Sequence, residues 1–178
     1  MVPAPSTFRF ESDGETPNNA TLPLLLYREV VPADAAGDAA GWFERTFATH
    51  NWTQAWRNGI HPFLHFHTAA HEVLGIAAGR ASVQFGGRAG VTLDVAAGDV
   101  VVLPAGTGHR RLAASRDLLV VGAYPANGRF DQRRPGEVDI DTVCRAVAAV
   151  PLPEMDPIAG ARGPLTTLWR PITSRRRS

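Results

Sequence analysis

The middle of the chain, residues 52–124, alternates between short apolar stretches and clusters of turn-forming residues. The strongest turn signals are Asn58-Gly59, Gly79-Arg80, Gly86-Gly87, Ala97-Gly98-Asp99 and Gly106-Thr107-Gly108. Short strands separated by such signals roughly every eight to twelve residues are typical of a β-sandwich or a β-barrel. The pattern therefore predicts an all-β core over residues 52–124.

The residues before this core are expected to form a strand and a helix that pack on it. An apolar run covers residues 22–31, and a second apolar pattern follows at every fourth position: Ala39, Phe43 and Phe47. This spacing predicts a helix with one buried stripe, and Asp34 or Asp38 can cap its N-terminus. Residues 1–51 are therefore expected to be an N-terminal extension of the barrel.

Residues 125–178 are rich in Pro and Gly and are expected to form a C-terminal extension. One helix is predicted from about Asp141 to Val150. The run 165–169 is expected to fold back on the body of the protein, because its large apolar side chains are costly to expose: Leu165, Leu168 and Trp169. The arginines at the end of the chain are expected to form a disordered basic tail: Arg175, Arg176 and Arg177.

Composition and charge narrow the class of protein. The chain has 178 residues, a formal net charge of +1 and 18 basic residues, all of them Arg. This length fits one domain, and no basic helix or aromatic-interleaved patch predicts a nucleic-acid partner. No segment is long and apolar enough to cross a bilayer, and no N-terminal stretch has the pattern of a signal peptide. We therefore expect a cytoplasmic protein without a membrane partner.

Cys144 is the only cysteine of the chain. A single cysteine excludes an intrachain disulfide and a Cys-based zinc cluster. Its neighbours are mostly Ala and Val, so we expect it to be a small buried side chain.

The dipeptide Asn58-Gly59 predicts a hairpin that would gather aromatic and imidazole side chains on one face. Asn-Gly is the preferred two-residue type I′ turn, so the strand that ends at Arg57 should pair with one that begins at Ile60. Because strand side chains alternate between faces, one face would carry Trp52, Gln54, Trp56, His61, Phe63, His65 and His67. Pro62 lacks an amide hydrogen and could shift this register by one residue.

Two histidines on one face can bind a single metal ion together with residues from neighbouring segments. Glu72 follows a short turn after His65 and His67, and His109 follows a loop that contains Gly and Pro. Imidazole nitrogens and a carboxylate oxygen suit a transition metal better than calcium or magnesium. His71 is a rival to Glu72, because these two neighbours would point to opposite faces.

These residues belong to two spaced patterns that resemble the two motifs of the cupin superfamily. Residues 59–79 read Gly, five residues, His-x-His, four residues, Glu, six residues and Gly. Residues 98–109 read Gly, five residues, Pro, one residue, Gly, two residues and His. Ala113 stands where the second motif usually has Asn, a departure at a structural position. The likeness covers roughly residues 52–124 and is closest to small single-domain bacterial cupins.

The resemblance implies a double-stranded β-helix, or jelly-roll barrel, with one divalent transition metal ion at its centre: iron, manganese, nickel or zinc. It implies metal ligands at His65, His67, Glu72 and His109, and its spacing favours Glu72 over His71. If the ion is six-coordinate, four protein ligands leave two positions open for small molecules. The same analogy implies a homodimer.

Further residues are candidates for a substrate cavity: Trp52, Gln54, Trp56, His61, Phe63 and Arg111. Arg111 lies two residues after His109, so in a regular strand it would face inward and could bind an anionic substrate through paired hydrogen bonds. The aromatic residues could equally be barrel core, and Arg111 could pair with a local carboxylate. His61 is expected at the rim, as a general base or a surface residue. Tyr124 could be a cavity phenol or a capping side chain.

These features favour a metal-dependent enzyme of the dioxygenase type that acts on a small chelating molecule, with Glu72 as ligand or general base. Two alternatives stay open: a metal-dependent isomerase or lyase, and a non-catalytic cupin that binds a sugar or another small molecule. A DNA-binding regulator is disfavoured, because no helix-turn-helix pattern precedes the barrel.

Overall fold

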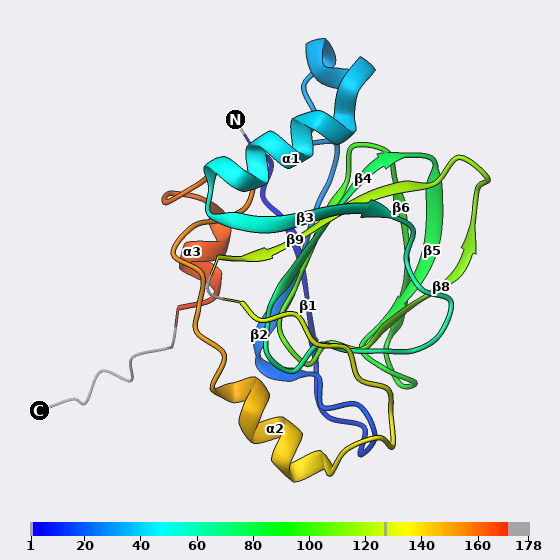
Figure 1. Ribbon diagram of the computed structural model, residues 1–178, viewed down its shortest axis with the longest axis vertical. Coiled ribbons are helices and arrows are strands. Elements are labelled where there is room, and N and C mark those ends of the chain that lie inside the picture. The colour runs from blue at the N-terminus through cyan, green and yellow to red at the C-terminus, as the bar shows by residue number, and fades with distance from the viewer. Residues whose placement is uncertain (1, 127, 171–178) are drawn as a thin grey trace, which may run out of the picture.

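The computed structural model describes residues 2–126 and 128–170, and within these ranges nine strands form two antiparallel sheets (Figure 1). The larger sheet contains, in spatial order, β1 (Ser6–Phe10), β2 (Asn19–Tyr27), β7 (Val100–Leu103), β4 (Glu72–Ala78), β9 (Leu119–Pro125) and β3 (Trp52–Asn58). The smaller sheet contains β6 (Val91–Ala96), β5 (Arg80–Phe85) and β8 (His109–Ala114). This architecture confirms the predicted all-β double-stranded β-helix.

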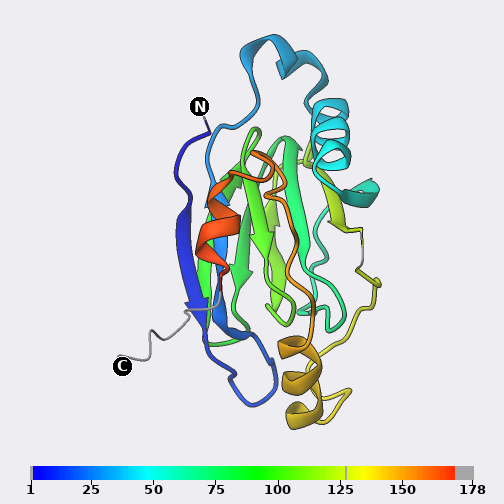
Figure 2. The same ribbon diagram turned by 90° about the vertical axis from the view of Figure 1, so that its left-hand side faces the viewer.

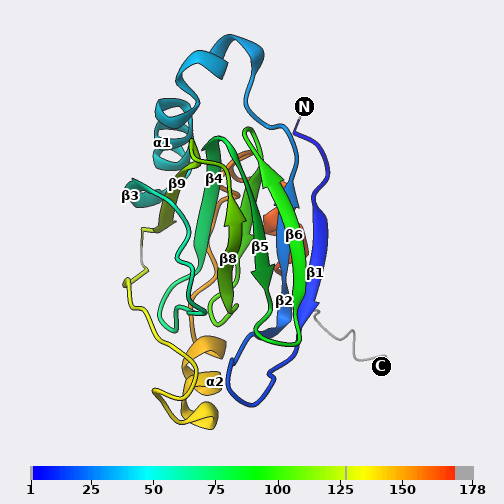
Figure 3. The same cartoon turned by 90° about the vertical axis from the view of Figure 1, so that its right-hand side faces the viewer.

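Apolar side chains from the two sheets pack together inside the barrel. Leu74 and Ile76 of β4 belong to the same buried cluster as Val83 and Phe85 of β5. The alternation of side chains along each strand sends one set inward and leaves the other outside. Figure 3 shows the smaller sheet in front of the larger one. The buried cluster contains side chains from both sheets.

Helix α1 (Ala39–Thr49) packs on the outside of the larger sheet and follows the short 3₁₀ helix η1 (Ala33–Asp38). Asp38 caps α1, because its Oδ1 accepts a hydrogen bond from the amide of Gly41 at 3.0 Å. The buried stripe is the predicted one: Ala39, Phe43 and Phe47. The ring of Phe43 lies against Gly75 of β4, where an added Cβ would come within 2.7 Å of it. The predicted helix is confirmed.

The two N-terminal strands are part of the barrel wall. β2 pairs with β7 through Leu25↔Val102, Leu26↔Val101 and Tyr27↔Val100, and β1 pairs with β2 at the edge of the sheet. The first part of the apolar run 22–31 thus lies in strand β2, where it is largely buried. Strands β1 and β2 therefore extend the larger sheet.

The predicted hairpin at Asn58-Gly59 is wrong. β3 pairs with β9, through partners that include Trp56↔Gly122 and Asn58↔Val120. Neither residue of the dipeptide is among the described residues with a positive φ, which a type I′ turn requires at both central positions. Gly122 leaves room for the Trp56 ring in this non-local pairing, because a Cβ at position 122 would lie 2.1 Å from that ring.

Residues 59–71 consequently form a long loop in place of a strand. Within it, His65 forms an isolated bridge to His109 and Phe66 forms one to Arg133. Phe66 is buried with Ala105 and with two side chains of helix α2, Val143 and Val147. The loop is therefore anchored by the barrel on one side and by the C-terminal part of the chain on the other.

The C-terminal part contains α2 (Ile140–Ala148) and α3 (Pro164–Leu168). Helix α2 matches the predicted helix, and its Cys144 is half-buried, less than expected. The segment after residue 160 folds back on the larger sheet (Figure 2), where Trp169 donates a hydrogen bond to the Pro23 carbonyl at 2.8 Å. Leu165 is buried as expected, whereas Leu168 is 38% exposed. Arg175, Arg176 and Arg177 lie outside the described residues.

None of the helices in the described ranges has the length and apolar character that a membrane span needs.

Candidate metal centre

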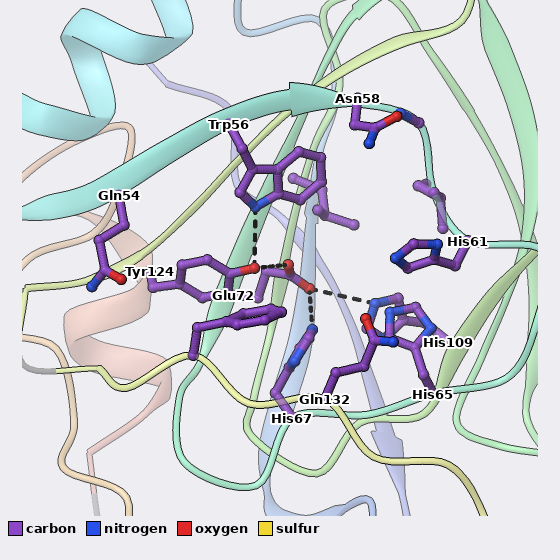
Figure 4. A pocket seen from close by; sticks show the side chains of 14 residues that line it. Gln54, Trp56, Asn58, His61, His65, His67, Glu72, His109, Tyr124 and Gln132 are labelled. Carbon is purple, nitrogen blue, oxygen red and sulfur yellow. Dashed lines mark hydrogen bonds and ion pairs between the residues drawn. The ribbon is translucent and has the colours of Figure 1, made fainter.

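Four polar side chains meet in the interior of the barrel, and each is at most 5% exposed (Figure 4). His65 and His67 come from the loop 59–71, Glu72 is the first residue of β4, and His109 is the first residue of β8. The backbones of His65 and His109 exchange two hydrogen bonds, at 3.2 and 2.9 Å. This bridge is what brings the two sequence motifs together.

The ligand atoms of the three histidines all lie within 4.8 Å of one another. Glu72 adds a carboxylate beside them, with Oε2 at 3.2 Å from His67 Nε2 and 3.4 Å from His109 Nε2. Each of these nitrogen and oxygen atoms could thus contact the same metal ion. The three histidines could hold one metal ion, with Glu72 placed next to it.

The other ring nitrogen of each histidine lies against a backbone carbonyl. His65 Nδ1 is 3.2 Å from the Phe63 oxygen, His109 Nδ1 is 3.0 Å from the Thr107 oxygen, and His67 Nδ1 contacts the Asp131 oxygen. A carbonyl oxygen only accepts, so each Nδ1 carries the hydrogen. The tautomer that leaves the Nε2 lone pair for a metal ion is therefore favoured at all three rings.

The charges in the site are strongly coupled. Burial, followed by repulsion from His109 and His67, lowers the pKa of His65 to about 2. Burial opposes protonation of His67 as well, but the Glu72 carboxylate raises the pKa of His67 to about 9. Burial alone would raise the pKa of Glu72, yet His67 and His109 hold it well below its usual range. Without a metal ion, the centre thus contains an ionised carboxylate beside a protonated His67.

Two buried atoms of the site lack a hydrogen-bond partner among the described residues: His67 Nε2 and Glu72 Oε2. They lie within ion-pair distance of each other, but not in hydrogen-bond geometry. Buried polar atoms without partners are destabilising. A divalent transition ion would satisfy both, because it accepts imidazole nitrogen and carboxylate oxygen alike. The donor set therefore fits such an ion.

A chain of two hydrogen bonds orients the carboxylate. Trp56 Nε1 donates to the Tyr124 hydroxyl at 3.1 Å, and that hydroxyl donates to Glu72 Oε1 at 3.1 Å. Burial and the charge of Glu72 both raise the pKa of Tyr124, so its hydroxyl stays protonated and donates. Oε1 is thereby occupied, and Oε2 is the oxygen that faces the histidines (Figure 4).

The four side chains lie on one wall of a cavity of about 350 Å³ that is open on one side. Its lining consists of Gln54, Trp56, Asn58, Gly59, Ile60, His61, His65, His67, Glu72, Leu74, His109, Tyr124, Phe130 and Gln132. Among the substrate-cavity candidates of the sequence, Gln54, Trp56 and His61 line it. The cavity combines side-chain amides with aromatic rings, which suits a small molecule that has both polar and apolar parts.

The three other candidates lie outside this lining. Trp52 is 1% exposed in the core and donates a hydrogen bond to the Met155 carbonyl at 2.9 Å. The reason is an irregularity in β3 between Thr53 and Trp56, where Gln54 has a φ of 55°. This bulge breaks the alternation that would have placed Trp52 on the same face as Gln54 and Trp56.

Phe63 lies in the loop 59–71, which does not form the predicted strand, and Arg111 lies on β8. Phe63 stacks on His61, with ring centroids 4.6 Å apart, and Arg134 lies 3.9 Å from its centroid. Arg111 is half-buried, and its amide donates to the His61 carbonyl at 2.9 Å. Both residues contact His61 without belonging to the lining themselves.

His71, the rival of Glu72, lies apart from the three-histidine group. Its Nδ1 accepts a hydrogen bond from the Ala105 amide at 2.9 Å, and its ring packs on Trp169 with centroids 4.8 Å apart. Burial lowers the pKa of His71 to about 4, so it is a neutral core side chain.

Sequence reasoning missed several lining residues: Asn58, Gly59, Ile60, Leu74, Phe130 and Gln132. Asn58 and Gly59 were interpreted as a turn. Phe130 and Gln132 come from the Pro- and Gly-rich region after the barrel, where no periodicity or motif indicates a role. Only the fold brings them to the cavity.

Comparison with known proteins places the chain in a family. It is 34% identical over 163 residues to the uncharacterized protein YjlB of Bacillus subtilis (strain 168), a match that covers 92% of this chain and 95% of YjlB. The chain belongs to the YjlB family. No protein-family model matches it. The two motifs of this YjlB relative meet through the pairing of β4 with β7 and through the bridge between His65 and His109. Together with the double-stranded β-helix, this confirms the cupin resemblance.

Among solved structures, the YjlB relative is similar to acireductone dioxygenase from Bacillus anthracis, with a TM-score of 0.41 and 14% identity over 59% of this chain and 80% of the other. It is also similar to the dTDP-6-deoxy-D-glucose-3,5-epimerase RmlC from Legionella pneumophila, with a TM-score of 0.44 and 11% identity over 79% and 81%. A third similar structure is a Klebsiella pneumoniae protein with a double-stranded β-helix domain. Its TM-score is 0.38 and its sequence identity is 12%, over 73% of this chain and 92% of the other. These likenesses concern the fold alone.

Proposed function

We propose that this protein is a metal-dependent enzyme of the dioxygenase type that acts on a small chelating molecule. The observation that carries the proposal is the convergence of three histidine nitrogens and one carboxylate oxygen on the wall of an open cavity. A buried cluster with no cavity would favour a structural ion. A cavity beside the ligands gives a substrate direct access to the ion.

The proposed ligands are His65, His67, Glu72 and His109, and the proposed cofactor is one divalent ion of iron, manganese, nickel or zinc. When bound, such an ion supplies Lewis-acid polarisation and, if it is redox-active, electron transfer to dioxygen. Nitrogen donors from three imidazoles make calcium or magnesium a poor alternative.

The chain's own residues then have distinct tasks. The amides of Gln54, Asn58 and Gln132 can donate hydrogen bonds to the oxygens of a substrate, since each lines the cavity. The rings of Trp56 and Phe130 offer apolar faces, and Phe130 is 55% exposed. Together they would orient the substrate and exclude bulk water from the metal face.

Glu72 is proposed to shift between two roles, a metal ligand through Oε2 and, when Oε2 leaves the ion, a general base. Tyr124 holds Oε1, while Oε2 is buried and has no hydrogen-bond partner among the described residues. A carboxylate with one oxygen oriented in this way can accept a proton from a bound substrate at Oε2. Its lowered pKa keeps the carboxylate ionised at neutral pH, as a metal ligand must be.

Metal analysis and oxygen uptake test the proposal. Protein purified without an affinity tag is analysed for metal, loaded anaerobically with Fe(II), and supplied with dioxygen and a panel of small chelating substrates. His65→Ala and His109→Ala should each lose metal and turnover. His50→Ala is the control, because the His50 ring bonds to the Pro157 carbonyl away from the cavity.

The outcomes separate the proposal from its alternatives. Stoichiometric metal retained by the His65→Ala/His109→Ala double variant would contradict the ligand assignment. Binding of a substrate candidate without metal and without turnover would favour a non-catalytic binding protein, and oxygen-independent turnover with zinc would favour an isomerase or lyase. The expected homodimer and cytoplasmic location stay predictions, which light scattering and cell fractionation would test.

A further inference from the structure

A segment beyond the barrel, residues 128–134, runs alongside the cavity, and we refer to it as the strap. Phe130 and Gln132 of the strap line the cavity. Two backbone hydrogen bonds attach it to the loop 59–71, from Phe66 N to the Arg133 oxygen at 3.0 Å and from Arg133 N to the Phe66 oxygen at 2.9 Å. The strap thus contacts the loop that carries His65 and His67.

Asp131 is the central attachment of the strap. Its Oδ1 accepts hydrogen bonds from the amides of Thr68 at 2.8 Å and Ala69 at 2.9 Å, and its Oδ2 accepts one from the Thr68 hydroxyl at 2.6 Å. Its backbone oxygen contacts His67 Nδ1. One residue therefore binds both the imidazole of a candidate ligand and the turn that follows it.

His67 differs in this respect from the two other histidines of the site. The carbonyl partners of His65 and His109 lie only two residues earlier in their own segments, at Phe63 and Thr107. The partner of His67 lies 64 residues later in the chain. Local backbone geometry can orient His65 and His109, but His67 depends on the strap.

We propose that Asp131 is a positioning residue, which anchors the strap so that its carbonyl orients His67 toward the metal ion. The inference rests on the proposed metal centre. Hydrogen-bond partners of ligating histidines fix the tautomer and the ring direction, and their loss typically weakens metal binding by roughly 10- to 100-fold. The C-terminal extension thereby contributes to the geometry of the metal site.

Three variants distinguish positioning from mere stabilisation of the fold. Asp131→Ala removes all three side-chain hydrogen bonds. Asp131→Asn can keep them, because its Oδ1 still accepts from both amides and its Nδ2 can donate to the Thr68 oxygen. Asp99→Ala is the matched control, since the Asp99 carboxylate also accepts from two amides, Glu29 at 3.2 Å and Ala96 at 3.0 Å.

Asp99 is a suitable control because of its position. It precedes Val100, which pairs with Gly75, whereas Glu72 pairs with Leu103. Three residues of strand separate these pairs, or roughly 10 Å. Its loss should destabilise the protein without reaching the metal ligands.

The probe is Co²⁺, titrated into the metal-free protein in competition with a chelator and followed by its visible absorption. We expect Asp131→Ala to bind Co²⁺ at least about tenfold more weakly with an altered spectrum, Asp131→Asn to stay within about threefold of the wild type, and Asp99→Ala to match it. Hydrogen exchange of the strap amides should rise in Asp131→Ala alone.

Two failures are distinguishable. If the wild type binds no Co²⁺, the proposed metal centre is refuted, and the proposed role of Asp131 is refuted with it. If the wild type binds Co²⁺ and Asp131→Ala binds it with equal affinity and spectrum, only the role of Asp131 is refuted. Should Asp131→Ala fail to fold, Thr68→Ala decides: it removes one of the three bonds, so a severalfold loss of affinity supports the proposal and an unchanged affinity overturns it.

Discussion

The hydroxyl of Tyr124 offers a sharp test of how the carboxylate of the site is held. Tyr124→Phe removes a donor to Glu72 Oε1 and an acceptor for Trp56 Nε1, both at 3.1 Å, and changes little else. The Phe ring fills nearly the same volume, so no cavity is created. The measured effect should therefore report the hydrogen bonds themselves.

The magnitude follows from the burial of each partner. Glu72 is 3% exposed, so its Oε1 would lose a charge-assisted bond that water cannot replace. Such a bond contributes about 1.5–3 kcal/mol. Trp56 is only half-buried, so its Nε1 can bond to water at small cost. We expect the metal-free protein to lose about 1.5–3 kcal/mol of unfolding free energy, and Co²⁺ affinity to fall on the order of tenfold.

Urea denaturation and Co²⁺ titration measure the two effects, and Tyr27→Phe is the control. Tyr27 donates to the buried carboxylate of Asp156 at 2.5 Å, in a part of the core away from the cavity. Its loss should reduce stability comparably and leave Co²⁺ binding unchanged. Equal stability losses in the two variants with no change in Co²⁺ affinity for Tyr124→Phe would refute the orienting role of Tyr124. An unchanged stability for Tyr124→Phe would refute the energetic reasoning.

Three further predictions concern packing, pH and metal removal. Gly75→Ala should lower the unfolding free energy by about 1–3 kcal/mol, because its Cβ would lie 2.7 Å from the Phe43 ring, whereas Gly37→Ala, with nothing within 4 Å, should not; urea denaturation measures both. The metal-free protein should lose stability as pH rises through about 9, the raised pKa of His67 in the folded state. In the unfolded chain His67 releases its proton near the ordinary pKa of 6.5, so the protonated His67 contributes its full stabilisation only below pH 6.5. His67→Gln should show no such decline in a series of urea titrations. Removing metal with a chelator should lower Tm in a calorimetric scan of the wild type and leave Tm unchanged in His65→Ala, which would already have lost the ion.

Local patterns in the sequence determined a large part of the fold. Helix α1 was predicted with its stripe, and with Asp38 as one of two candidate caps, because these residues are close in sequence and act over one or two turns: Asp38, Ala39, Phe43 and Phe47. The turn at Gly79 was predicted for a similar reason, since its φ of 71° suits glycine. Such signals require only neighbours along the chain.

The candidate metal ligands were also visible in the sequence. The spacing of His65, His67, Glu72 and His109 belongs to two recognisable motifs, and the fold brings all four together. The reasoning from the hairpin failed, however, although it placed His65 and His67 correctly on one side. The motif carried the information, whereas the turn dipeptide did not.

Only the tertiary structure decided the surroundings of these ligands. β3 pairs with β9, more than 60 residues later, and the bulge at Gln54 turns Trp52 away from the cavity. Asp131 reaches His67 from beyond the barrel. These contacts are made by backbone groups, which every residue has, and by apolar surfaces that become buried only when the chain is folded. No local pattern of residues therefore predicts them. The sequence by itself thus determined which side chains could bind a metal, and the packed chain decided which nitrogen each histidine presents and what shares their cavity.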